Sequence, residues 1–105
     1  MQYKTTILYR LKAHPTLYRR LHKKRLLTTT LEVYADKLRE RHQEWQQQLS
    51  QLTPRKDVAQ LASAAMQIAL KELEYPLLSG APPEAVEPLS LGEAMLLLKH
   101  HTPLA

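Results

Sequence analysis

Residues 27–52 read LTTTLEVYADKLRERHQEWQQQLSQL, and apolar side chains recur in this stretch every three or four residues. That spacing places them on one face of an α-helix. The stripe consists of Leu27, Leu31, Tyr34, Leu38, His42, Trp45, Leu49 and Leu52. A helix of about 25 residues is roughly 37 Å long. We therefore expect a spine that the other helices pack against, ending at Pro54.

A second long helix is predicted directly after the spine, over about residues 57–75. Asp57 has the side chain of an N-cap residue. Apolar residues, many of them alanines, recur with helical spacing from Val58 to Leu73. Since the connection from Leu52 to Asp57 is short, the two helices are expected to form an antiparallel hairpin.

Prolines divide the remaining sequence. Pro15 separates two short helices predicted at residues 3–13 and 15–26. Residues 76–89, PLLSGAPPEAVEPL, hold four prolines and a glycine and are predicted to be a linker. Pro76 is expected to end the second long helix. Ser90 and Glu93 have the spacing of a capping box, which predicts a C-terminal helix at residues 90–101.

Composition supports the same fold class. The 105 residues predict a single domain, 1–105. They include 21 Leu but only two Ile and three Val, and the β-branched and aromatic residues that strands favour are scarce. We expect an all-α protein, a small helical bundle built on the hairpin. The absence of cysteine excludes disulfides and thiolate chemistry and fits a cytoplasmic protein. No apolar run approaches the ~20 residues that span a bilayer, so no membrane association is expected.

Charge is distributed unevenly along the chain. Residues 1–56 carry thirteen Lys/Arg against four Asp/Glu, a net charge of +9. Residues 57–105 carry two against six, a net charge of −4. A basic half of this kind predicts a polyanionic or acidic partner.

The densest part of the basic half is the predicted polyanion-binding surface. We call it the basic cluster, and it comprises Arg10, Lys12, Arg19, Arg20, Lys23, Lys24 and Arg25. Phosphate binding needs such density, and the interleaved Tyr9 and Tyr18 could stack on bases. The sequence favours a non-enzymatic accessory protein that binds DNA or RNA with weak sequence specificity, as a subunit of a nucleoprotein assembly or a dimer. Two alternatives stay open: a protein-interaction module whose cations dock on an acidic partner, and a solvated face without a partner.

Other classes of site find little support. The sequence holds no catalytic pair of acids, nucleophile motif or phosphate-binding glycine loop, so no enzyme and no cofactor are expected. The five histidines lack metal-ligand spacing. A helix-turn-helix is not favoured, because no glycine lies near the predicted turns. His42 falls on the apolar stripe, as a core or interface residue and a candidate protonation switch.

The C-terminal helix is apolar for its length. Leu91, Met95 and Leu98 share one face, which either folds back on the hairpin or docks on a neighbouring subunit in a homo-oligomer. Trp45, midway along the spine, is expected in the core, with an interface as the alternative. The candidate interface residues are therefore Trp45, Leu91, Met95 and Leu98.

Overall fold

The computed structural model describes residues 3–53 and 57–101, and within them the chain forms five α-helices, a short 3₁₀ turn and no strand. The elements are α1 (Tyr3–Lys12), α2 (Pro15–Lys23), α3 (Leu27–Leu52), α4 (Val58–Ser79), η1 (Pro83–Ala85) and α5 (Leu91–His101). The all-α prediction is confirmed. No helix among these residues is long and apolar enough to cross a membrane.

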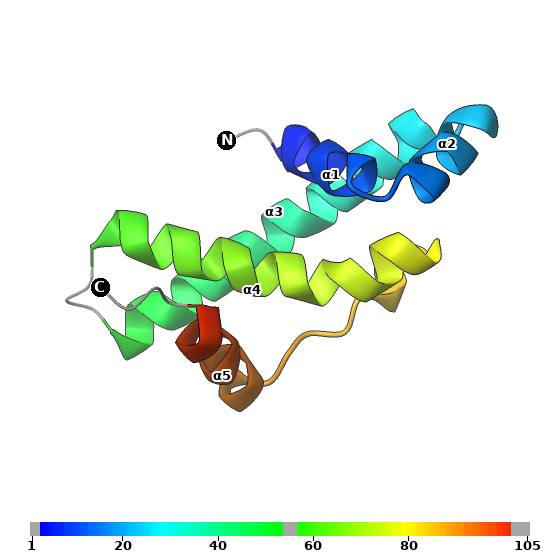
Figure 1. Cartoon of the computed structure of the whole chain (residues 1–105). Coiled ribbons are helices and arrows are strands. Elements are labelled where there is room, and N and C mark those ends of the chain that lie inside the picture. Colours follow the sequence, from blue (N-terminus) through cyan, green and yellow to red (C-terminus); the bar gives the residue numbers. More distant parts are fainter. Residues whose placement is uncertain (1–2, 54–56, 102–105) are drawn as a thin grey trace.

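The long helices α3 and α4 pack along each other in opposite directions and form the predicted hairpin (Figure 1). Two predicted caps are present. The Asp57 carboxylate accepts a hydrogen bond from the Ala59 backbone N–H at 3.1 Å. At the start of α5, the Ser90 N–H donates to Glu93 Oε1 at 3.1 Å, and the Glu93 N–H donates to Ser90 Oγ at 3.2 Å. Pro54, predicted to end α3, lies outside the described residues; α3 ends at Leu52.

Two apolar clusters lie at opposite ends of the hairpin. In the first, α1 and α2 cover the N-terminal half of α3 and the C-terminal half of α4 around Ile7, Leu11, Leu38 and Leu73. In the second, α5 covers the other half of the hairpin (Figure 1). Its buried members are Trp45, Leu49, Leu61, Ala65, Ile68 and Ala94. The hairpin is therefore a scaffold that carries the N-terminal helices at one end and α5 at the other.

The end of α4 differs from the prediction. The helix continues through Pro76 to Ser79, so the linker begins at Gly80 rather than at Pro76. A proline in a helix removes one backbone hydrogen bond. Here that loss falls in the last turn, where Pro76 and Leu77 are buried. Gly80 then adopts the left-handed conformation, with φ 78°, and ends the helix.

The segment between α4 and α5 is held against the hairpin. The Tyr34 hydroxyl on α3 donates a hydrogen bond to the Ala81 carbonyl. The Leu89 backbone N–H donates to Glu72 Oε2 on α4 at 2.9 Å. Val86 between them is buried in the first cluster. Residues 80–90 thus have little regular structure apart from η1, as the prolines predicted, but they form a strap with fixed contacts to the hairpin.

Candidate nucleic-acid interface

All seven residues of the basic cluster are exposed on α1, α2 and the turn that follows α2. Within the described part of the chain, none of them has an ion-pair partner. Arg19 makes only a long hydrogen bond, 3.4 Å from its Nε to the Pro15 carbonyl. The positions of α1, α2 and the following turn bring these cations to the surface, and their charge forms no ion pair within the described structure.

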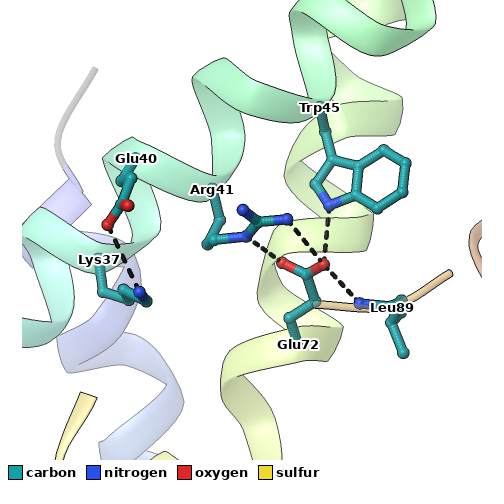
Figure 2. Close-up of polar contacts among 6 residues, drawn as sticks. All are labelled: Lys37, Glu40, Arg41, Trp45, Glu72 and Leu89. Carbon is teal, nitrogen blue, oxygen red and sulfur yellow. Dashed lines mark hydrogen bonds and ion pairs between the residues drawn. The ribbon is translucent and has the colours of Figure 1, made fainter. Parts of the chain in front are cut away.

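Cations on the hairpin behave differently. Lys37 pairs with Glu40 at 3.5 Å, and Arg39 pairs with Asp36 at 3.3 Å. Arg41 pairs with the buried Glu72 (Figure 2). The unpaired positive charge of the described surface is therefore concentrated on α1, α2 and the turn after α2, in a part of the sequence that holds no acid before Glu32.

The structure places the basic cluster at three locations. Arg19, Arg20, Lys23, Lys24 and Arg25 lie on α2 and its C-terminal turn, where Leu17 and Leu21 face the core and leave the cations outward. Lys12 is exposed at the end of α1. Arg10 instead faces α4 and lines a cleft with Leu70 and Glu74. The five cations on α2 and its turn lie within seven consecutive residues of the chain, whereas Arg10 belongs to the cleft.

Arg25 has an unusual backbone conformation. Its φ of 59° lies in the left-handed region, which costs a residue with a Cβ about 1 kcal/mol or more. The conformation closes α2: the Arg25 N–H donates to the His22 carbonyl at 3.1 Å, and the Leu26 N–H donates to the Leu21 carbonyl at 2.9 Å. This is a Schellman motif, in which glycine usually takes the left-handed position. Here that position carries an exposed guanidinium.

Of the two tyrosines predicted to interleave the basic cluster, only Tyr9 is free to stack. Tyr9 is 78% exposed. Tyr18 packs partly against the first core cluster, and His22 stacks on its ring with 6.4 Å between ring centroids. The stacking prediction therefore remains open for Tyr9, while Tyr18 has a structural role.

Trp45 and Leu98 are less available as interface residues than the sequence suggested. Trp45 is 1% exposed within the chain, so its assignment as an interface residue is corrected to the core residue that was its other interpretation. On α5, Ala94, Leu97 and Leu98 face the hairpin. Leu91 and Met95 are 42% and 38% exposed, because α5 is rotated relative to the predicted inward face. They remain candidates for contact with a partner.

Sequence reasoning missed a buried polar centre around Glu72, whose side chain is fully buried (Figure 2). Its Oε1 accepts from Arg41 Nε at 2.8 Å, and its Oε2 accepts from Arg41 Nη2 at 3.3 Å. Oε2 also accepts from Trp45 Nε1 at 2.8 Å and from the Leu89 N–H. One carboxylate thus joins α3, α4 and the strap. Its position, four residues after Ile68 and three after Ala69, continues the buried stripe of α4 and was the available signal.

His42 is a structural residue. It is 3% exposed, and both ring nitrogens are hydrogen-bonded. Because a carbonyl only accepts, Nε2 carries the proton and donates to the Ala62 carbonyl at 2.9 Å. Nδ1 lies 2.9 Å from the Tyr3 hydroxyl oxygen, and in the neutral ring it accepts the hydrogen bond that this hydroxyl donates. The imidazole therefore connects α1, α3 and α4. No group of three or more potential metal ligands occurs among residues 3–53 and 57–101.

Three ionisable groups are shifted by their surroundings. Burial, assisted by the charge of Glu84, raises the pKa of Tyr34 to about 12. The hydrogen bonds that Arg41 donates to Glu72 raise the pKa of Arg41 above its usual value, against the opposing effect of burial. The capping hydrogen bonds from Ser90, its backbone N–H first, lower the pKa of Glu93. All three shifts lie outside the basic cluster and concern the stability of the fold.

Comparison with protein-family models, with curated proteins and with solved structures found no match to this chain.

Proposed function

We propose that this protein binds nucleic acid through the basic cluster, as a non-enzymatic accessory protein. One observation carries the proposal: seven exposed cations without ion-pair partners in the described structure gather on two short helices, while the hairpin cations Lys37, Arg39 and Arg41 are paired with acids. Cations that the fold does not use are free to displace counterions from a phosphate backbone.

The arrangement favours weak sequence specificity. Contacts to phosphates position a protein on nucleic acid without reading bases. The α2 cations extend outward from a helix of nine residues whose inner face is taken by the core. No side chain of the Asn or Gln type that reads adenine lies between Tyr3 and Arg41. We expect similar affinities for unrelated sequences, and a role within a nucleoprotein assembly or as a dimer.

The test is a salt titration of binding to DNA and RNA by fluorescence anisotropy. The double variant Arg20→Ala/Lys24→Ala should bind nucleic acid more weakly than the wild type does. The loss of affinity should be the same for unrelated sequences. The log–log salt slope of this variant for duplex DNA should be shallower by about 0.9 for each lost phosphate contact. The matched control is Lys37→Ala/Arg39→Ala, which removes the same charge from cations that already have acid partners. It should leave the slope close to that of the wild type.

A second candidate is a protein-interaction module. It is favoured by the exposed apolar side chains of Leu91, Met95 and Leu96 on α5, the last of them 58% exposed. In that case the basic cluster docks on an acidic protein surface. Absence of binding to both DNA and RNA at about 50 mM salt, where phosphate contacts are strong, would remove the first proposal and leave the second.

A further inference from the structure

A furrow runs between α1 and α4 on the surface next to the basic cluster. Two hollows lie between the helices: Tyr9 and Arg10 line one with Leu70, and Arg10 and Leu70 line the next with Glu74 and Leu78. A third hollow adjoins the second at Glu74 and Leu78; it is lined by residues of α4 alone and includes Tyr75. We call the three together the α1–α4 furrow. Its floor between the helices is apolar, with Leu70, Leu73 and Leu77, and its far end lies on the surface of α4.

The two ends of the furrow carry the two most exposed aromatic rings of the described chain. Tyr9 is 78% exposed and Tyr75 is 80% exposed. The other aromatic side chains have internal partners. Tyr3 is hydrogen-bonded to His42, Tyr34 to the Ala81 carbonyl of the strap, and Trp45 to Glu72. Tyr18 packs against the first core cluster. The rings of Tyr9 and Tyr75 are therefore not needed to complete the core, and both lie on the same furrow.

The charge of the furrow also suits a polyanion. Arg10 has no ion-pair partner in the described structure, and His14 lies beside it at the junction with α2. The acid of the furrow, Glu74, is neutralised by Lys71 at 3.0 Å. A chain with phosphates on one side and flat apolar rings on the other would match the unpaired cations and the exposed tyrosines together.

We propose that the α1–α4 furrow binds single-stranded nucleic acid, with bases stacked on Tyr9 and Tyr75 while Arg10 and the α2 cations hold phosphates. This inference rests on the proposed function and names its substrate. In a duplex, bases are stacked on one another and are not available to protein rings. In a single strand they stack on aromatic side chains with little sequence preference.

The test compares three ligands of equal phosphate number: a single-stranded oligothymidine, the same strand with abasic sites, and a duplex. The wild type should bind the oligothymidine roughly tenfold or more tightly than the abasic strand, because each stacked base adds affinity. Oligouridine in place of oligothymidine distinguishes RNA from DNA as the preferred strand.

Variants then locate the stacking. Tyr9→Leu and Tyr75→Leu keep apolar area but remove the ring, and each should lower affinity for oligothymidine without changing affinity for the abasic strand. Tyr9→Phe and Tyr75→Phe should retain wild-type affinity. Because both rings are exposed, all four variants should melt close to the wild type, so a loss of binding cannot be ascribed to unfolding.

The outcomes separate this inference from the proposed function. If none of the ligands binds, the proposed function itself fails. If all three bind, but the abasic strand binds as tightly as oligothymidine and the leucine variants change nothing, the basic cluster binds phosphates and the furrow does not bind bases. In that case the inference is overturned while the proposed function stands, and a protein helix becomes the better candidate for the furrow.

Discussion

Helices α2 and α4 end in the same motif with opposite residue choices. At the end of α4, Gly80 occupies the left-handed position, its N–H donates to the Leu77 carbonyl, and the Ala81 N–H donates to the Pro76 carbonyl. At the end of α2, Arg25 occupies the equivalent position with the equivalent hydrogen bonds. Glycine adopts the left-handed conformation without steric strain. Arg25 adopts it with the strain that a Cβ brings, and it places a cation at that position.

The same contrast holds for the regions around the two helix ends. Near α4, polar groups serve the fold: Glu72 joins three elements, and Tyr34 holds the strap. Around α2, exposed cations have no partner among the described residues. The difference indicates that the hairpin region is built for stability, whereas the α2 region carries chemistry that stability does not require. The following predictions test that division, beginning with the largest effect.

Truncation before Ser90 should abolish cooperative folding. Ala94 is fully buried, and Leu97 and Leu98 pack against the second core cluster. Without α5, the ring of Trp45 and the side chain of Ile68 would be exposed to water. Circular dichroism during heating and light scattering measure the outcome. A truncated chain that still melts cooperatively as a monomer would show that the hairpin is stable without α5.

Glu72→Ala should destabilise the fold by about 3–5 kcal/mol, the cost of leaving a buried charge without its partner. Arg41, whose side chain is 12% exposed, would lose both its hydrogen bonds, and the Trp45 and Leu89 N–H groups would lose their acceptor. Chemical denaturation measures the change. Glu72→Gln, which retains one accepting oxygen, should cost less. Equal losses for the two variants would show that the negative charge, which both remove, matters here rather than the shape that glutamine keeps.

Tyr34 should make stability fall at alkaline pH. Below pH 10 the phenol is neutral in both states. Between pH 10 and about 12 only the unfolded state ionises, because the folded-state pKa is raised to about 12. Stability therefore falls as pH rises through that window. Tyr34→Phe should lower the free energy of unfolding by about 1 kcal/mol at neutral pH, because it removes the hydrogen bond to the Ala81 carbonyl. The free energy of unfolding of this variant should also depend less on pH between 10 and 12 than that of the wild type. If the two fall in parallel over this range, Tyr34 is not the group responsible.

The two helix ends should respond in opposite directions to substitution. Arg25→Gly should stabilise the fold by about 1 kcal/mol relative to Arg25→Ala, because both remove the cation and only glycine relieves the left-handed strain. Gly80→Ala should destabilise by a similar amount. A Cβ at Gly80 would meet no atom within 4 Å, so that cost would come from the backbone alone. Urea denaturation of the three variants gives both differences, and equal stability of Arg25→Gly and Arg25→Ala would argue against strain.

The smallest effect is expected where binding is proposed. Arg20→Ala/Lys24→Ala should change the free energy of unfolding by less than about 0.5 kcal/mol per site, as is usual for exposed residues without special contacts. The same variant should lose affinity for nucleic acid. Thermal melting measures the first quantity. A large loss of stability would mean that these cations serve the fold, and the division between the two regions would not hold.

Local sequence signals were reliable for the helices and their caps. The three- and four-residue spacing of apolar side chains predicted α3 from Leu27 to Leu52, and Asp57, Ser90 and Glu93 marked helix starts correctly. Pro76 was interpreted by its local effect alone, and that prediction was wrong, because burial of Pro76 and Leu77 outweighs one lost hydrogen bond. The inward face of α5 was also misplaced, since six of its eleven residues are apolar and periodicity alone could not choose among them.

The sequence by itself determined which segments are helical, that the charge divides at the hairpin, and that the N-terminal cations have no acid nearby along the chain. Those properties depend on neighbours within a few residues. Tertiary structure decided the rest: it buried Glu72 against Arg41 and Trp45, and it exposed Tyr9 and Tyr75 at opposite ends of one furrow. Glu72 lies 31 positions from Arg41 and 27 from Trp45, and the two tyrosines are 66 positions apart. These arrangements follow from how the helices pack, which no local pattern of side chains specifies.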